Sequence, residues 1–337
     1  MWVWITKKRN DINNIKKIDL HMHSSISDGT DSPEEIIKKV MDAGIDLFSL
    51  TDHDSVKGAT IVRDMLSSMD TLSKPEDQSG KDMPSEEEKL SVKGGQPDTE
   101  DDRNVRKLPV FVSGVEFSCR DSDGRYHILG YGYDPSNPRC RLLADKVHGF
   151  RMQKAKDRLD YLDIKYGIRF SDEDVDNYFA MENPGKPQLG NLLVSYGYAP
   201  DRSKAIEQYI NNLRIKSSFI YPEEAIDVIL DGGGVPVLAH PSLGSGGEYI
   251  MGYDMELRLR HLIGMGLQGV EAYYSRFTNG MRSEMLYFAE KYGLYVTAGS
   301  DYHGSNKRVE LGDNKLGDAR QGAPGLIRFI SRILGDS

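Results

Sequence analysis

Residues 18–54, IDLHMHSSISDGTDSPEEIIKKVMDAGIDLFSLTDHD, contain the signals for a strand, a helix and a second strand in succession. Ile18 to Met22 is a short apolar run typical of a buried strand. A helix is predicted after Ser32, because this residue suits the N-cap, a proline follows it and a glutamate stands three residues further on. Gly44 suits the end of this helix, and Ile45 to Thr51 is the next expected strand. The β-α-β order predicts a parallel sheet or barrel.

Five further strands are expected along the chain, and helical patterns separate the last of them. The strands are predicted at Val110–Glu116, Tyr126–Tyr131, Val235–Ala239, Leu267–Tyr273 and Leu294–Ala298, and the helices at Pro222–Leu230, Met255–Met265 and Met281–Tyr292. About seven strands with intervening helices favour a barrel of the β/α type, built from 1–134 and 220–337. The apolar spacing of 135–219 is helical and predicts an inserted helical domain over one face.

Residues 65–107 lack an apolar period and are rich in Ser, Asp, Glu, Lys, Pro and Gly. Such a stretch buries too little apolar area to offset its ordering entropy, so it is predicted to be a flexible acidic surface insertion with helix at its edges. Both a solvated loop and a regulatory or partner-binding segment fit this composition.

The whole chain has 337 residues and a net charge of −9, which argues against binding long duplex nucleic acid through a wide basic surface. No apolar run approaches the ~20 residues of a membrane span. Met1–Ile5 is too short for a signal-peptide core and reads as a terminal strand or tail, so a cytoplasmic location is expected. Cys119 and Cys140 are expected to be buried thiols, because two cysteines form no disulfide framework.

Histidine and carboxylate side chains stand at the ends of most predicted strands. In β/α barrels the loops that follow the strands meet at one mouth, so these side chains are expected to converge although they are distant in sequence. Burying several polar clusters without partners would cost a few kcal/mol each, which favours a shared metal centre over separate structural roles. The clusters are His21-Met22-His23, Asp52-His53-Asp54, Glu116, His127 at the start of the fourth strand, His240, and Asp301-Tyr302-His303.

The spacings of these residues agree with metal binding. His21 and His23 point the same way in an extended segment and are expected to hold one ion. Glu116 offers two oxygens and is a candidate bridge between two ions. Imidazole with carboxylate suits zinc, manganese or iron rather than calcium or copper(I). His148 and His261 lie in helical stretches and are expected to be structural or surface residues.

At these positions the chain resembles the polymerase and histidinol phosphatase (PHP) family of metal-dependent phosphoesterases, in its stand-alone branch. The resemblance covers nearly the whole chain in the family's order. The matching motifs are Asp19-Leu20-His21-Met22-His23-Ser24 with Ser27-Asp28-Gly29, then Leu50-Thr51-Asp52-His53-Asp54, Gly114-Val115-Glu116, Ala239-His240-Pro241 and Gly299-Ser300-Asp301-Tyr302-His303.

The resemblance implies a distorted seven-stranded β/α barrel that holds two or three divalent ions (Mn, Fe or Zn). It implies that His21, His23, Glu116 and Asp301 hold one ion, and that Glu116, His240 and His127 hold a second. Asp28, His53 and His303 would hold a third. One position departs from the pattern: related chains often carry Arg/Lys-Pro-His in the inserted domain, where this chain has Lys186-Pro187-Gln188. Glutamine is a poor metal ligand.

Three functions fit these features. The first is hydrolysis of a phosphomonoester of a nucleotide or similar small metabolite by metal-activated hydroxide, with Asp301 or His303 as a candidate for passing a proton to the leaving group. The second is a 5′–3′ exonuclease on short oligonucleotides. The third is a catalytically impaired binding or regulatory module. An amidohydrolase is less favoured, because no predicted strand end carries the bridging lysine that such enzymes usually need.

Arg151 and Lys154 lie one helical turn apart at the start of the inserted domain, with Arg158 a turn further. They are candidates for a substrate phosphate clamp. A solvated basic helix face accounts for them equally well. Arg276, after the sixth predicted strand, is a second candidate.

Overall fold

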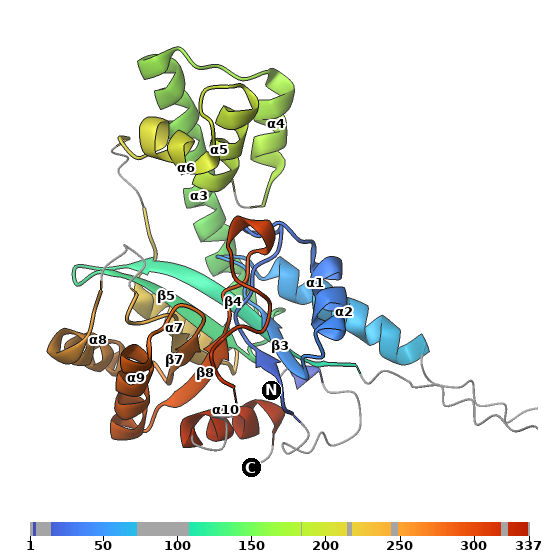
Figure 1. The fold of residues 1–337 in the computed structure, drawn as a ribbon, viewed down its shortest axis with the longest axis vertical. Coiled ribbons are helices and arrows are strands. Elements are labelled where there is room, and N and C mark those ends of the chain that lie inside the picture. Colours follow the sequence, from blue (N-terminus) through green and yellow to red (C-terminus); the bar gives the residue numbers. More distant parts are fainter. Residues whose placement is uncertain are drawn as a thin grey trace, which may run out of the picture.

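The computed structural model describes residues 3–4, 15–72, 108–182, 184–213, 218–243, 249–317 and 323–335. A single sheet with strand order β2-β3-β4-β5-β6-β7-β8 forms its centre, and β1 pairs with β4 (Figure 1). The strand bounds are β1 Val3–Trp4, β2 Ile18–Asp19, β3 Leu47–Leu50, β4 Val110–Arg120, β5 Arg125–Tyr131, β6 Val235–Leu238, β7 Gly269–Tyr274 and β8 Tyr295–Gly299.

The two ends of this sheet meet, so the seven strands β2–β8 form a nearly closed barrel. The amide of Leu20 donates to Ala298 O at 3.0 Å, and Met22 pairs with Tyr302 in a parallel bridge. The strands are buried along almost their whole length, as expected for a sheet covered on both faces. The predicted α/β barrel of about seven strands is therefore confirmed.

One part of the barrel differs from the all-parallel order that the β-α-β opening suggests. β4 pairs antiparallel with β5, and β5 pairs antiparallel with β6, whereas the other neighbours within β2–β8 are parallel. β4 continues past Glu116 to Arg120, because it forms a hairpin with β5. The side chain of Asp121 closes the hairpin turn by accepting from the amides of Asp123 and Gly124.

Helices cover the barrel on its outside. The cap of α1 is as predicted, because the Ser32 side chain accepts from the amide of Glu35 and the Glu35 side chain accepts from the amide of Ser32. The helices are α1 Pro33–Asp42, α2 Lys57–Leu72, α7 Pro222–Asp231, α8 Gly252–Gly264, α9 Asn279–Tyr292 and α10 Pro324–Leu334, with a short 3₁₀ turn, η4, at Gly304–Asn306.

The residues from 138 to 210 form a helical region that stands above the barrel in Figure 1. Its long helix α3 packs Leu143 and Val147 into the barrel core and Ala155 and Leu162 into a separate core. This region comprises α3 Pro138–Tyr166, α4 Asp172–Ala180, α5 Lys186–Ser195, α6 Arg202–Ala205 and a π-helical turn, η3, at Ile206–Ile210. The helical character predicted for 135–219 is confirmed for these residues.

Three smaller expectations have mixed outcomes. The terminal strand is present as β1, and both cysteines are free and buried. Of the predicted acidic insertion, 65–72 completes helix α2, and 73–107 lies outside the described residues. Within the described part of the chain, no helix has the length and apolar character to cross a bilayer.

Candidate metal centre

The two histidines that follow β2 point at the same spot. Their Nε2 atoms lie 3.2 Å apart, and both lie close to Glu116 Oε2, at 3.2 and 3.1 Å. Asp301 Oδ1 is 3.6 Å from His21 Nε2 and 3.4 Å from His23 Nε2. All four side chains are buried. We call His21, His23, Glu116 and Asp301 the first donor group.

The spacing in the first group fits a shared cation. Ligand atoms bound to a tetrahedral ion at about 2.0–2.2 Å lie about 3.3–3.6 Å from one another. The carboxylates also favour positive charge here: burial lowers the pKa of His23, but its contacts with Asp301 and Glu116 outweigh burial and raise the pKa to about 9. In an ion-loaded centre, the cation would replace that proton.

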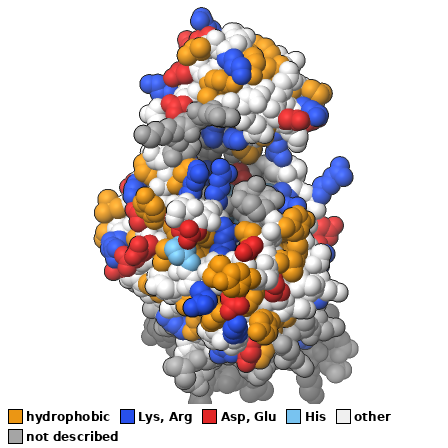
Figure 2. All heavy atoms as spheres, turned by 90° about the vertical axis from the view of Figure 1, so that its left-hand side faces the viewer, with side chains coloured by type: hydrophobic (Ala, Val, Ile, Leu, Met, Phe, Trp, Pro, Cys, Tyr) orange, Lys and Arg blue, Asp and Glu red, His pale blue; other side chains and the backbone are white. Residues whose placement is uncertain are grey.

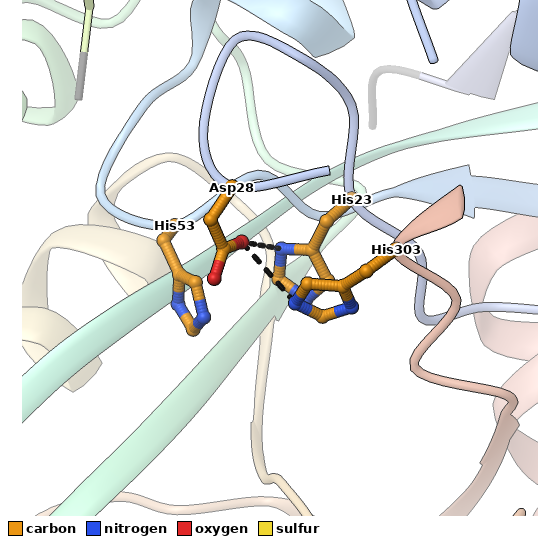
Figure 3. A group of neighbouring side chains, drawn as sticks. All are labelled: His23, Asp28, His53 and His303. Carbon is orange, nitrogen blue, oxygen red and sulfur yellow. Dashed lines mark ion pairs between the residues drawn. The ribbon is translucent and has the colours of Figure 1, made fainter. Parts of the chain in front are cut away.

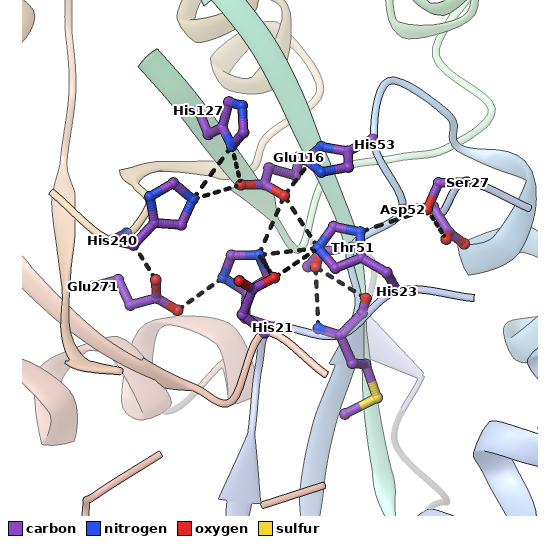
Figure 4. Close-up of polar contacts among 12 residues, drawn as sticks. His21, His23, Ser27, Thr51, Asp52, His53, Glu116, His127, His240 and Glu271 are labelled. Carbon is purple, nitrogen blue, oxygen red and sulfur yellow. Dashed lines mark hydrogen bonds and ion pairs between the residues drawn. The ribbon is translucent and has the colours of Figure 1, made fainter. Parts of the chain in front are cut away.

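A second donor group forms on the other oxygen of Glu116. His127 Nδ1 lies 2.9 Å and His240 Nε2 lies 3.3 Å from Glu116 Oε1, and the two histidine nitrogens are 3.2 Å apart. Figure 4 shows Glu116 between the two groups, with one oxygen toward each. The bridging position predicted for Glu116 therefore has a geometric basis. His127 is the third residue of β5, rather than the first residue of its strand.

The third group gathers around Asp28, which lies in the turn after β2 (Figure 3). Asp28 Oδ1 is 3.2 Å from His303 Nε2 and 3.8 Å from His23 Nδ1. This oxygen is buried and has no hydrogen-bond partner among the described residues, which is the state expected of a ligand atom facing a cation. Asp28, His53 and His303, together with His23, have donor atoms within 4.8 Å of one another.

His53 lies between the groups. Its Nδ1 is 3.2 Å from Glu116 Oε2, so His53 also forms a set with Glu116 and His127. The nine residues predicted as metal ligands thus lie close together in one largely buried cluster. The described residues contain the imidazole and carboxylate set that zinc, manganese and iron prefer.

Further residues orient these ligands, and the sequence prediction missed them. Glu271, on β7, accepts from His21 Nδ1 at 2.9 Å and from the amide of His240 at 2.8 Å. Bonding Nδ1 to Glu271 leaves Nε2 of His21 free to face the centre. A signal for Glu271 existed, because it is the one charged residue in the buried strand Gly269–Tyr274.

Asp301 is held in the same way. Its Oδ2 accepts from Tyr274 Oη at 2.8 Å and from Lys307 Nζ at 2.6 Å, which leaves Oδ1 toward the first group. Burial raises the pKa of Asp301, but Lys307 and the neighbouring histidines outweigh burial and hold it well below its usual range. The backbone at Asp301 and at His240 has positive φ, 60° and 31°, so the chain bends sharply at both ligands.

A pocket of about 280 Å³ lies beside the second and third groups, between the barrel and the helical region. Asp28, His53 and His127 form part of its wall. Figure 2 shows Lys and Arg side chains gathered where the upper, helical part meets the barrel. Five cationic residues line the pocket: Arg125, Arg151, Lys154, Arg158 and Lys186.

The predicted phosphate-binding residues lie in this pocket. Arg151 Nε donates to Asp54 Oδ2 at 2.9 Å, and Lys154 Nζ lies over the Phe219 ring at 3.9 Å. Burial and the neighbouring Arg151 and Arg158 lower the pKa of Lys154 to about 8. Arg276 is exposed after β7 and does not line the pocket.

Three other predicted residues take structural roles. His148 Nδ1 contacts the carbonyl of Glu182 at 2.8 Å, and His261 pairs with Asp121 at 2.9 Å, so neither joins a donor group. Gln188 lines the pocket, but its Nε2 donates to Ser27 O at 3.0 Å and its Oε1 accepts from the amide of Gly185 at 3.1 Å. The Gln188 amide is therefore engaged in hydrogen bonds on both sides.

Comparison with known proteins places these features in a family. The model of the PHP domain matches residues 19–88. A phosphoribosyl 1,2-cyclic phosphate 1,2-diphosphodiesterase of Eggerthella lenta is 26% identical, over 86% of this chain and 95% of that protein. A 5′-3′ exoribonuclease of Haemophilus influenzae is 25% identical, over 89% of this chain and 94% of that protein. A 3′,5′-nucleoside bisphosphate phosphatase of Chromobacterium violaceum is also 25% identical, over 85% of this chain and 87% of that protein. Residues 19–88 therefore carry the signature of the PHP domain, and the chain is similar along most of its length to phosphoesterases, with the donor groups of a metal-dependent member.

Proposed function

We propose that this phosphoesterase removes a phosphate group from a nucleotide or a similar small phosphorylated metabolite. The observation that carries the proposal is the junction of two features: donor groups joined through Glu116, and a pocket beside them with five cationic residues. Asp28 and His127 belong to both features, so a phosphate in the pocket would lie next to the ions.

The proposed cofactors are two or three divalent ions, Mn, Fe or Zn. His21, His23, Glu116 and Asp301 would hold the first ion, and Glu116, His127 and His240 the second. Asp28, His53 and His303 would hold the third, because their donor atoms lie within 4.8 Å of one another while His23 offers Nε2 to the first group. Paired divalent ions lower the pKa of water to form hydroxide and neutralise charge on a phosphoryl group.

The chain's own residues then bind the ester and move protons. Arg151, oriented by Asp54, and Lys154 would hold the phosphate from the pocket wall, where an anion would also relieve repulsion among the five cations. Asp301 and His303 are the proposed residues for proton transfer. Lys307 keeps Asp301 ionised, which suits it to hold an ion and to orient a bound water by accepting a hydrogen bond from it.

The size of the pocket favours a small substrate. Its volume of about 280 Å³ is at the lower limit of the roughly 300–1,000 Å³ of small-molecule sites. The second candidate, removal of nucleotides from the 5′ end of a short oligonucleotide, is favoured by the similarity to the Haemophilus influenzae exoribonuclease.

We also propose the domain division 1–134 with 220–337 for the barrel and 135–219 for the inserted domain, supported by the separate core of the helices.

The test is phosphate release by the purified chain with added Mn²⁺. Substrates would be a nucleoside monophosphate, a nucleoside 3′,5′-bisphosphate, p-nitrophenyl phosphate and a 5′-phosphorylated trinucleotide. Release from the nucleotides at a higher kcat/KM than from the trinucleotide supports the proposal. Shortening of the trinucleotide with the higher kcat/KM would favour the exonuclease. The absence of both phosphate release and shortening of the trinucleotide would indicate a binding module.

A further inference from the structure

Asp28 differs from the other metal-ligand candidates in how it is positioned. It lies in a turn, and its side chain is 27% exposed, whereas His23 and His303 in the same group are 0% and 3% exposed. No strand pairing fixes it. Its position therefore depends on whatever holds the turn at residues 25–28.

One contact comes from helix α5 of the helical region. Gln188 Nε2 donates to the carbonyl of Ser27, the residue before Asp28, at 3.0 Å. Gln188 is fixed in turn, because its Oε1 accepts from the amide of Gly185 at the start of the same helix. The side chain thus ties α5 to the turn.

A second contact holds the next carbonyl. Asn306 Nδ2 donates to Asp28 O at 2.7 Å. The other side of Asn306 is held from the helical region: Arg202, on α6, donates through Nη1 to Asn306 Oδ1 and through Nη2 to Asn306 O at 3.1 Å. Arg202 therefore acts on Asp28 through Asn306.

Gln188 and Arg202, which support the two contacts, belong to one packed unit. A Cβ placed on Gly190 of α5 would lie 3.0 Å from Arg202 Cγ and 3.0 Å from Ile206, so α5 and the start of α6 approach closely. Movement of this unit away from the barrel would release the Ser27 carbonyl and remove the support of Arg202 for Asn306, which holds the Asp28 carbonyl.

We infer that the helical region completes the third metal position: Gln188 and Arg202, the latter through Asn306, are positioning residues that hold Asp28 against His53 and His303. Gln188 acts by hydrogen bonding to the turn. The inference rests on the proposed function for its metal assignment. Of the three ions, only the third depends on docking of the helical region.

The test is a Mn²⁺ titration of the chelator-treated full chain, with free Mn²⁺ counted by electron paramagnetic resonance. The variants are Arg202→Met, which keeps the methylenes that pack on Gly190, and Asn306→Ala, which leaves the helical region intact. Each is expected to weaken one of three Mn²⁺ sites at least tenfold and to leave the other two unchanged. Tenfold is the lower end of the effect of losing an orienting contact. Lys204→Met is the matched control, since Lys204 is on the same helix but pairs only with Glu207 among the described residues.

Asn306→Ala keeps the test decisive if the helical variant fails to fold. Unchanged affinity at every site, an equal loss at all three sites, or fewer than three ions in the wild-type chain would overturn the inference. The readout is independent of catalysis: if the wild-type chain released no phosphate, the proposed function would fail while the ion counts still decided the role of Arg202 and Asn306.

Discussion

Glu271 offers the sharpest test of how the metal centre is oriented. Its side chain is fully buried, with one oxygen on His21 Nδ1 at 2.9 Å and the other on the amide of His240 at 2.8 Å. Glu271→Gln preserves the shape but replaces one acceptor oxygen by an NH₂ group. In either orientation of the new amide, its NH₂ group faces His21 Nδ1–H or the amide N–H of His240, so one of these two hydrogen bonds is lost.

The size of the effect follows from the lost contact. A hydrogen bond to a charged group contributes about 1.5–3 kcal/mol. With about 1.4 kcal/mol for each factor of ten, metal affinity should fall about 10- to 100-fold. The loss should affect the first and second positions, which use His21 and His240. The third position, built from Asp28, His53 and His303, should keep its affinity.

The assay is a Mn²⁺ titration followed by phosphate release at low and at saturating Mn²⁺. Activity at low Mn²⁺ should fall with the affinity, and excess Mn²⁺ should restore part of it. Glu256→Gln is the control, because Glu256 lies on α8 and binds Lys291 away from the centre. If Glu271→Gln bound Mn²⁺ as tightly as the wild type, the orienting role of Glu271 would be refuted.

Three further changes test other parts of the site. His23→Ala should remove the first metal position and phosphate release with it, whereas His261→Ala should change neither; metal content and phosphate release measure both, and unaltered release from His23→Ala would contradict its role. The lowered pKa of Lys154, about 8, means that its charge is present below pH 8 and is lost as the pH rises through 8. KM should therefore rise above pH 8 in the wild type and stay flatter in Lys154→Arg, and parallel pH profiles would remove Lys154 from the phosphate site. Gly299→Ala would place a Cβ 2.1 Å from the side chain of a first-group histidine, so it should lower metal affinity and destabilise the fold by about 1–3 kcal/mol, as measured by thermal unfolding. Gly280→Ala, whose Cβ has no neighbour nearer than 3.8 Å, should be tolerated, and equal behaviour of the two variants would count against the close packing.

Local sequence signals predicted most of the barrel and its ligands. The cap at Ser32 and the apolar runs at 47–50 and 235–238 depend on interactions between near neighbours, and these formed as expected. The ligands were predictable because polar residues at the ends of buried strands have few other roles.

The β4–β5 hairpin was harder to predict. The sequence predicts a strand that ends at Glu116, because the motif ends there. In the structure β4 continues to Arg120, because these residues pair with β5. Whether a strand continues depends on pairing with a distant segment, and periodicity within one strand carries no information on that pairing.

The sequence by itself determined the kind of chemistry: which imidazoles and carboxylates are present, and that they follow strands. Only the tertiary structure decided how they are shared. It placed Glu116 between two donor groups, turned His21 with Glu271, and brought Gln188 and Arg202 onto the turn that carries Asp28. The physical reason is that the contacts of Arg202, Gln188 and Glu271 join residues 104, 161 and 250 positions apart, and hydrogen-bond direction is fixed only when the separate strands and helices are packed together.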